Sequence, residues 1–264
     1  MPVDDRTATY HDLHQGQLTQ QERLTQTSAR IILDDLSRYI QVRSVLDVGC
    51  GLGTWLGVAQ ELGIQDVRGI EGHWLDPTRL VIDPSLVTLC DLEKGFALGR
   101  RFDLAMCLEV GEHLSEQAAG TLVSSLAAHA DLVLFSAAIP FQGGHHHVNE
   151  RFPDYWANLF AGHGFSPVDC LRPRIWANPD ILWWLRQNIL VFAHGRALEA
   201  HGALLEEQRV ARPLSVVHPD VYVARVTAAN RVLEDHQKLI NLLAQGGTFA
   251  VTRLPDGQLN VAKV

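Results

Sequence analysis

Two carboxylates and an imidazole stand at a spacing that brings their side chains together. Glu109, Glu112 and His113 occupy positions i, i+3 and i+4, which lie on one face of a turn or short helix. Two acids on one site repel each other unless a cation or a proton lies between them. Carboxylate oxygens and an imidazole nitrogen can bind Mg²⁺ or Mn²⁺. The spacing therefore indicates either a divalent metal site or a metal-free site in which His113 is a general base.

A run of three histidines further along the chain offers another ligand. His145, His146 and His147 follow a glycine pair, Gly143 and Gly144. Side chains alternate along an extended chain, so His145 and His147 would point to the same side. We take His147 as the first candidate for a ligand or proton acceptor and His145 as the second. An exposed loop without a chemical role is the alternative.

A glycine-rich loop follows the segment Leu46–Val48, in which Asp47 stands between two apolar residues. Glycine stands at positions 49, 51 and 53, where the backbone can turn tightly and approach a ligand closely. Such a loop, between a strand and a helix, holds nucleotide-like cofactors at the carboxyl end of a parallel sheet. A dinucleotide fingerprint requires Gly or Ala where Thr54 stands, and the carboxylate of Asp47 would repel a pyrophosphate. The loop therefore favours a cofactor other than NAD.

The segment Asp47-Val48-Gly49-Cys50-Gly51-Leu52-Gly53 resembles motif I of the class I S-adenosylmethionine (SAM) methyltransferases, and the likeness extends over roughly residues 44–195. In that family the glycine loop passes under the amino-acid part of SAM. An acid at the end of the next strand accepts both ribose hydroxyls. A later acid meets the adenine amino group, and its neighbour packs on the ring. The resemblance implies these cofactor-binding residues: Asp47, Gly49, Cys50, Gly51, Gly53, Glu71 for the ribose, Asp91 and Leu92 for the adenine, and Glu109 at the methionine end.

The pattern E-x-x-E-H at Glu109–His113 resembles a motif of two methyltransferase groups. One group comprises the small-RNA 2′-O-methyltransferases and the other the O-methyltransferases of ubiquinone biosynthesis. Both hold a divalent metal with this motif, and in the RNA group a later histidine completes the set. The resemblance implies catalysis by Glu112, His113 and His147. The implied metal ligands are Glu109, Glu112, His113, His147 and His145.

Strand and helix patterns alternate through the middle of the chain and predict an α/β fold. We expect a Rossmann-like, seven-stranded, mostly parallel sheet with helices on both faces. The expected strands are 44–48, 67–70, 87–90, 102–108 and 132–137, with an antiparallel last pair at 165–171 and 189–194. The expected helices are 54–62, 115–129 and 153–163. The expected divisions are an N-terminal helical segment (1–42, with a helix over 17–42), a SAM-binding core (43–195) and a C-terminal helical extension (196–264).

The C-terminal extension predicts two helices, over 197–210 and 221–245, and a terminal hairpin around Asp256-Gly257. In the longer helix, apolar positions alternate four and three residues apart, as in a short coiled-coil seam. The seam consists of Tyr222, Val226, Ala229, Leu233, His236, Ile240 and Leu243. It could pack on its own domain or on a second copy of the chain, which would make a homodimer.

The composition limits the partners. The net charge of the 264 residues is −8 and no run of Lys or Arg stands out, so a large nucleic acid is disfavoured as a substrate. No apolar run is long enough to cross a bilayer and no signal peptide is evident. The scattered cysteines indicate reduced thiols, so we expect a cytoplasmic protein.

The region 153–188 is rich in tryptophan and arginine, which suit sugars, planar rings and anionic groups. The same tryptophans could equally be core residues. We therefore expect SAM-dependent O-methylation of a small molecule, such as a sugar or a secondary metabolite of natural-product biosynthesis, aided by Mg²⁺ or Mn²⁺. The alternatives are a metal-free N- or O-methyltransferase with a histidine base, an RNA 2′-O-methyltransferase, and a non-catalytic subunit with this fold.

Overall fold

The computed structural model describes residues 20–244, 246, 249–253 and 259–263. The chain divides into two compact units, Met1–Val216 and Val217–Val264. The first unit contains these helices and strands: α2 (Gln20–Leu36), β1 (Ser44–Val48), α3 (Thr54–Glu61), β2 (Asp66–Glu71), β3 (Val87–Leu89), β4 (Leu104–Leu108), α4 (Glu116–His129), β5 (Leu132–Ser136), α5 (Pro153–Ala161), β6 (Phe165–Val168), α6 (Arg172–Ile175), α7 (Trp183–Asn188), β7 (Leu190–His194), α8 (Gly195–Ala200) and α9 (Gly202–Gln208). The short 3-10 turns are η1 (Pro77–Arg79), η2 (Pro84–Leu86), η3 (Leu92–Lys94) and η4 (Gly111–His113).

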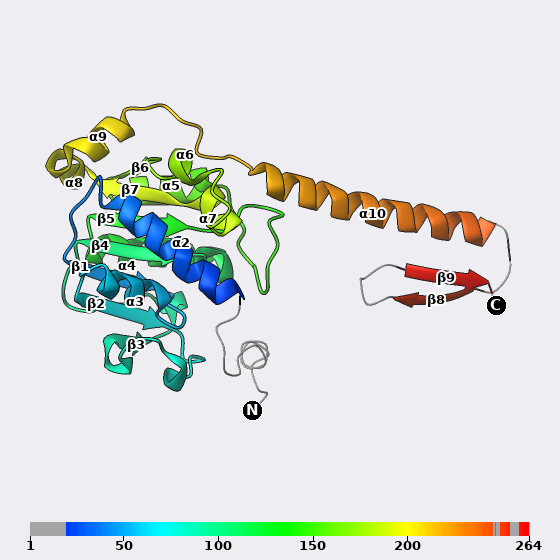
Figure 1. The fold of residues 1–264 in the computed structure, drawn as a ribbon, viewed down its shortest axis with the longest axis horizontal. Helices are drawn as coiled ribbons and strands as arrows, with labels where there is room; N and C mark the ends of the chain where they lie inside the picture. The colour runs from blue at the N-terminus through cyan, green and yellow to red at the C-terminus, as the bar shows by residue number, and fades with distance from the viewer. Residues whose placement is uncertain (1–19, 245, 247–248, 254–258, 264) are drawn as a thin grey trace. The chain divides into compact units, whose positions relative to one another are not determined.

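The first unit is built on a seven-stranded sheet with the strand order β3-β2-β1-β4-β5-β7-β6 (Figure 1). β1 pairs in parallel with β2 and β4, β2 with β3, and β4 with β5. β7 runs antiparallel to both β5 and β6. The predicted mostly parallel sheet with an antiparallel pair at one end is therefore confirmed.

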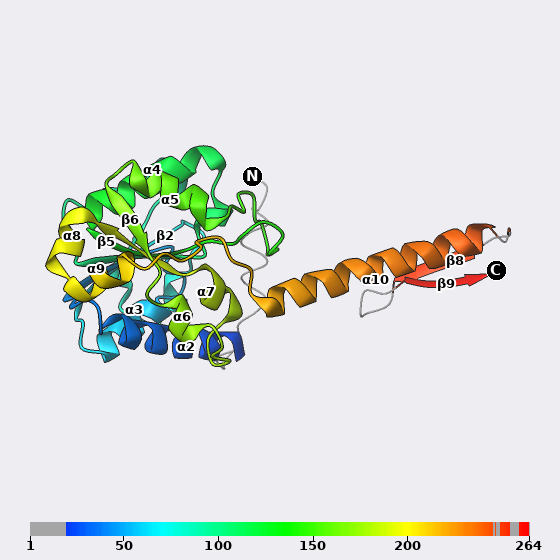
Figure 2. The same ribbon diagram turned by 90° about the horizontal axis from the view of Figure 1, so that it is seen from above.

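Helices cover both faces of this sheet. Successive side chains of a strand face opposite sides, so Val45 and Leu46 of β1 belong to two different apolar clusters. The Val45 cluster includes residues of α2 and α3, and the Leu46 cluster includes residues of α4 and α5. Figure 2 shows the same layers, with α4 and α5 above the sheet and α2, α3 and α6 below it. Because both faces are covered, the central strands are apolar on both sides.

The helix boundaries follow local chemistry. The Ser115 hydroxyl accepts a hydrogen bond from the Ala118 amide at 3.3 Å and caps the start of α4. Pro153 stands in the first turn of α5, where its missing N–H has no helical partner to lose. The helix predicted over 17–42 ends at Leu36 instead, where the Tyr39 amide bonds to the Leu36 carbonyl at 2.9 Å and tightens the last turn. Its predicted first residues, 17–19, lie outside the described part of the chain.

The second unit contains the long helix α10 (Pro219–Ala244) and two antiparallel strands, β8 (Phe249–Arg253) and β9 (Leu259–Lys263). The predicted long helix and terminal hairpin are thus present. The turn residues Asp256 and Gly257 lie outside the described part of the chain. Within α10, the seam residues Tyr222, Leu233 and Ile240 are 63%, 64% and 58% exposed.

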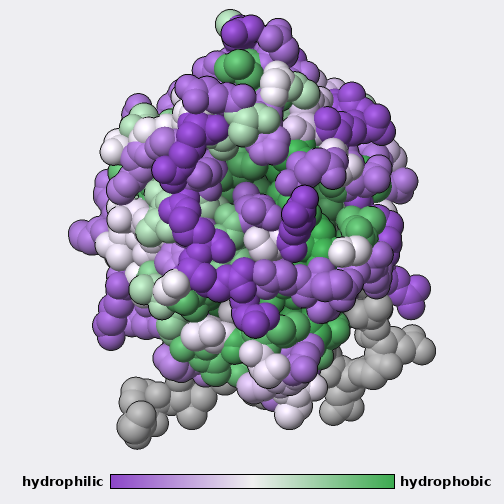
Figure 3. Space-filling view, turned by 90° about the vertical axis from the view of Figure 1, so that its left-hand side faces the viewer, coloured by the Kyte–Doolittle hydropathy of each residue, from purple (hydrophilic) through white to green (hydrophobic). Residues whose placement is uncertain are grey.

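Figure 3 faces the left-hand side of Figure 1 and shows a surface on which hydrophilic residues predominate, with apolar residues gathered in smaller areas. Such a mixture is usual on a protein face in contact with water. Among the described helices, none combines the length and the apolar character that a bilayer crossing requires.

Candidate active site

The carboxyl ends of the parallel strands meet at one edge of the sheet, and the loops that leave them carry the polar residues of interest. The strand order reverses direction between β1 and β4. In open α/β sheets, ligands bind at this switch point, outside the carboxyl ends of the strands. The loop after β1 holds the glycines, and the loop after β4 holds Glu109, Glu112 and His113.

The glycine loop is packed closely against the protein at one glycine and is open at another. Gly49 has φ +75°, and a Cβ there would lie 2.3 Å from a methyl carbon of Val110. Gly51 has φ +54°, and a Cβ there would meet nothing within 4 Å. The backbone is therefore packed against the protein at Gly49 and open to a ligand at Gly51.

Glu71, at the end of β2, holds the glycine loop by its carboxylate. One oxygen accepts a hydrogen bond from the Gly51 amide at 2.6 Å, and the other accepts one from the Gly72 amide at 2.7 Å. Burial raises the pKa of Glu71, and the two amides oppose that shift. A carboxylate has about four acceptor positions, so two remain beside these two amide bonds.

Asp47 lies beneath the same loop and carries an unsatisfied oxygen. Its side chain is buried, and the described residues provide no hydrogen-bond partner for Oδ2. Burial first, and the charge of Glu71 second, raise the pKa of Asp47 to about 8. A buried acid without a partner is suited to a cationic group, such as the ammonium group of an amino acid. The neighbouring Cys50 is a buried free thiol.

Asp91 is placed differently from Glu71. Its carboxylate accepts a hydrogen bond from the Glu93 amide at 3.1 Å and pairs with Lys94 at 3.2 Å. The hydrogen bond from Lys94, followed by that from Glu93, lowers the pKa of Asp91. The side chain of Asp91 is 44% exposed, whereas Leu92 is buried. Asp91 is accessible to a ligand here, and its contact with adenine remains a prediction.

Glu109 is held by a buried cluster of amides that the sequence analysis did not anticipate. Its carboxylate accepts hydrogen bonds from Gln142 at 3.3 Å and from Asn188 at 3.2 Å. Gln187 donates to the side-chain oxygens of both Gln142 and Asn188. The φ of Glu109 is +55°, a left-handed conformation rare for a residue with a side chain. Gln142 lies in the loop after β5, whereas Gln187 and Asn188 end helix α7, and no sequence spacing links them to Glu109.

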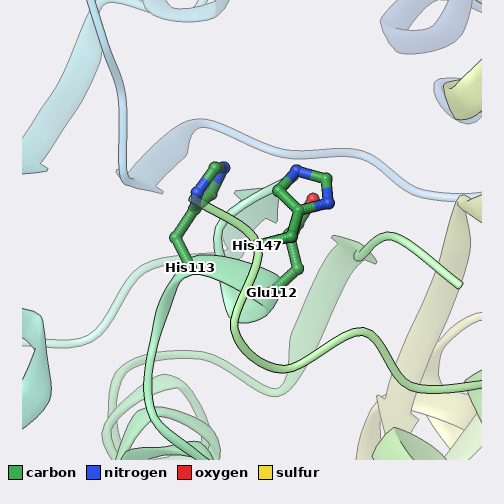
Figure 4. Close-up of side chains that lie close together, drawn as sticks. All are labelled: Glu112, His113 and His147. Atoms are coloured by element: carbon green, nitrogen blue, oxygen red, sulfur yellow. The ribbon is translucent and has the colours of Figure 1, made fainter. Parts of the chain in front are cut away.

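Glu112, His113 and His147 converge in the structure (Figure 4). One ligand atom from each of the three residues lies within 4.8 Å of the other two. The imidazoles of His113 and His147 meet edge to face with their centroids 4.9 Å apart. Two loops are joined here, since the amides of Val148 and Asn149 donate to the Glu112 carbonyl at 2.9 and 3.0 Å.

Glu112 is the acid at the centre of this group. Its side chain is 0% exposed, and neither carboxylate oxygen has a well-formed hydrogen bond within the described residues. Burial raises the pKa of Glu112 well above its usual range, and the charge of Glu109 raises it further. The backbone amides of Glu112 and Ala138 oppose this shift only in part. A carboxylate in this setting requires a proton or a cation.

Two predicted ligands lie outside the group of three. Glu109 is bonded to the amides described above, although its charge reaches Glu112. His145 is exposed and packs its ring on that of His146, with centroids 3.9 Å apart. The first-choice histidine, His147, therefore joins the group, and the second choice does not.

Two residues of the tryptophan- and arginine-rich region have a structural role. Trp156 is 1% exposed and packs on Phe135. Arg172 is 2% exposed and forms a bidentate pair with Asp169, and its guanidinium also donates to the carbonyl of Leu214. These two residues are core anchors, which was the alternative to a substrate-binding role.

The sequence matches the family described as methyltransferase domain over residues 20–170, more than half of the chain. The chain belongs to the methyltransferase-domain family. It is an enzyme, a SAM-dependent methyltransferase, as motif I implied. No curated protein matches the methyltransferase.

Solved structures resemble this methyltransferase, and one of them, DesVI, shows the shared fold. DesVI from Streptomyces venezuelae is 17% identical with a TM-score of 0.53, over 73% of this chain and 100% of that one. Magnesium protoporphyrin IX methyltransferase (ChlM) from Synechocystis PCC 6803 is 17% identical with a TM-score of 0.47, over 72% of this chain and 94% of that one. The sugar N-methyltransferase KedS8 from Streptoalloteichus sp ATCC 53650 is 18% identical with a TM-score of 0.45, over 72% of this chain and 93% of that one.

Proposed function

We propose that this methyltransferase transfers a methyl group from SAM to a hydroxyl of a small molecule, with a divalent cation held by Glu112, His113 and His147. The observation that supports this proposal most strongly is the buried Glu112 carboxylate, which lacks a well-formed hydrogen bond. An acid this buried is costly unless a cation or a proton offsets its charge. Two imidazoles with nitrogens within 4.8 Å of it supply the remaining protein ligands.

The residues around the glycine loop bind the cofactor in this proposal. Asp47 offers its unpaired oxygen to the ammonium group, and Gly51 leaves room for the amino-acid part of SAM. Glu71 accepts the ribose hydroxyls with the acceptor positions that its two amide bonds leave open. The exposed Asp91 accepts from the adenine amino group.

The reaction forms one bond and breaks one bond. The acceptor oxygen attacks the sulfonium methyl carbon in line, the carbon–sulfur bond breaks, and S-adenosylhomocysteine leaves. The hydroxyl proton passes to a histidine nitrogen or to water. A bound cation would lower the pKa of a hydroxyl that it touches. The protein contributes mainly by holding the two reactants close together and aligned.

Two features favour a small acceptor over a nucleic acid. The net charge of −8 opposes a polyanion. Phe141 and Val148 are 86% and 69% exposed on the same loop as His147. An acceptor with a planar ring or another apolar part would cover such side chains, as expected for a secondary metabolite.

Calorimetry with Mn²⁺ tests the proposal. The protein is stripped of metal, loaded with S-adenosylhomocysteine and titrated with Mn²⁺. We expect one binding site, and we expect Glu112→Gln to remove it because the neutral amide has nearly the same shape but no charge. S-adenosylhomocysteine should still bind the variant within about 3-fold, since Glu112 does not belong to the proposed cofactor-binding residues.

Glu116→Gln is the matched control, because Glu116 is a 59% exposed acid in the next helix and pairs with Arg151. It should bind Mn²⁺ like the native protein. Absence of Mn²⁺ binding in the native protein would contradict the metal site. Unchanged binding in Glu112→Gln would contradict the assignment of Glu112.

A metal-free reaction is the second candidate, and one contact favours it. Nδ1 of His147 lies 2.9 Å from a carboxylate oxygen of Glu150, the arrangement that orients a histidine general base. In that case His147 alone accepts the proton, and amines become possible acceptors. Turnover that survives metal removal, yet is lost in His147→Gln, would support this reading.

A further inference from the structure

The carboxylate of Glu150 connects three residues of the loop between β5 and α5 through hydrogen bonds. Glu150 accepts hydrogen bonds from the amides of Phe141 and Gly143, both at 2.8 Å, and from Nδ1 of His147 at 2.9 Å. The three donors stand at positions 141, 143 and 147 of this loop, which runs over residues 137–152. Loss of this carboxylate would therefore release the loop at three points.

The loop backbone needs such a restraint. Phe141 and His146 have φ values of +67° and +56°, and Gly143 has +68°. Residues with side chains adopt this left-handed conformation only where surrounding contacts hold them in it. The amide of Phe141 is itself one of the groups bonded to Glu150. The carboxylate thus stabilises the first of the left-handed residues in this loop.

The contact with Glu150 also decides which nitrogen of His147 carries the proton. An ionised carboxylate can only accept a hydrogen bond, so Nδ1 is the donor in this contact, and in the neutral imidazole Nε2 then keeps its lone pair. The imidazole is also restrained by the backbone of Gly144, because a Cβ at that position would lie 2.2 Å from Nε2. Carboxylate partners of this kind orient the histidines of many metal sites.

We propose that Glu150 is the positioning residue of this site, which holds His147 in the Nδ1–H form with Nε2 available to the Glu112–His113 group. This inference rests on the proposed function, which assigns His147 as a metal ligand or, in the second candidate, as a base. Either role requires an unprotonated Nε2 in a fixed place. Among the described residues, Glu150 bonds to His147 and to the loop amides of Phe141 and Gly143, so it acts on the proposed ligand group through His147.

Mn²⁺ titration of the protein loaded with S-adenosylhomocysteine provides the first test. Glu150→Gln should weaken Mn²⁺ binding by about 10- to 100-fold, as is common for partners of metal-binding histidines. Affinity for S-adenosylhomocysteine should stay within about 3-fold, which also shows that the variant folds. Glu116→Gln, again the matched control, should bind Mn²⁺ like the native protein. Native-like Mn²⁺ affinity in Glu150→Gln would overturn the inference.

Nitrogen NMR of the histidine rings in the metal-free protein provides a second test, independent of the metal. The His147 signals are assigned by their loss in His147→Gln. In the native protein they should show the Nδ1–H form, and in Glu150→Gln they should show a mixture or the Nε2–H form. A native Nε2–H form would overturn the inference even if Mn²⁺ binds. If the native protein shows the Nδ1–H form but does not bind Mn²⁺, the metal site is contradicted. Glu150 would then orient His147 as a general base.

Discussion

Several acids with little or no exposure to water lie at the carboxyl edge of the sheet, and they differ in how many hydrogen bonds their carboxylates accept. Glu71 accepts two backbone amides and Glu109 accepts two side-chain amides. Within the described residues, one oxygen of Asp47 and both oxygens of Glu112 lack a well-formed hydrogen bond. The unsatisfied oxygens mark the two places where a positive ligand group would lower the free energy most. This ranking agrees with the proposed function, in which Asp47 would face the cofactor ammonium group and Glu112 would bind the metal.

Asp47 makes the stability of the ligand-free protein depend on pH. Its pKa is about 8 in the folded state against 3.8 as the ordinary value, so the folded protein keeps a proton that the unfolded chain loses. Protonated Asp47 makes its full contribution to the free energy of unfolding below pH 4. This contribution falls by about 1.4 kcal/mol per pH unit as the pH rises towards 8.

Asp47→Asn should remove this part of the pH dependence and make the ligand-free variant more stable than the native protein at pH 8. Urea unfolding at pH 5, 6.5 and 8 measures the slope. The exposed Asp34→Asn on α2 is the control and should follow the native curve. The same Asp47→Asn change should weaken binding of S-adenosylhomocysteine, because the anion opposite the ammonium group is gone. A variant with the native slope would contradict the buried, protonated state.

At the scale of single elements, the glycine loop depends on backbone geometry more than on side chains. Gly49→Ala would place a methyl group in a left-handed residue and 2.3 Å from Val110. We expect a loss of about 1–3 kcal/mol in the free energy of unfolding and a clear loss of S-adenosylhomocysteine binding, because the loop must shift.

Gly57→Ala in α3 is the matched control, since its Cβ would meet its nearest neighbours at an ordinary 3.7 Å. Alanine is favoured over glycine inside a helix by up to about 1 kcal/mol, so this variant should be slightly more stable and bind normally. Thermal unfolding and calorimetry measure both effects. Equal behaviour of the two variants would show that the loop does not need its left-handed glycine.

The elements were more predictable from the sequence than the contacts between them. Alternation of apolar strands and helices, with Gly49–Gly53 between β1 and α3, predicted the sheet because burial of both faces requires that pattern. The E-x-x-E-H spacing and the later run of histidines also predicted that Glu112, His113 and His147 lie together, as they do, and their role stays a prediction. Glu150 and the amides around Glu109 were not assigned these roles. Their contacts depend on how loops after different strands fold back, and no sequence period records that.

At the scale of the whole molecule, the seam of α10 raises the question of self-association. Val226, Leu233 and Ile240 recur every seven residues and are 39%, 64% and 58% exposed, with Ala229 and His236 between them. The charged residues in the middle of the helix fall at the other positions of the repeat. They are Arg231, Glu234, Asp235 and Lys238. A repeat of seven fits a second helix with the same repeat, so a second copy of the chain is its natural partner.

We expect the full chain to form a dimer at micromolar concentration, and we expect Leu233→Asp to raise its dissociation constant by at least about 100-fold because a charge would be buried in the seam. Arg231→Asp introduces the same residue two positions away and off the seam, and it should leave the dimer intact. Sedimentation velocity measures the mass of each species. S-adenosylhomocysteine binding should be equal in both variants, since the cofactor-binding residues lie in the other unit of the chain. A native monomer, or a dimer that tolerates Leu233→Asp, would contradict the coiled-coil seam. A monomer destabilised by Leu233→Asp would indicate that the seam packs on its own chain.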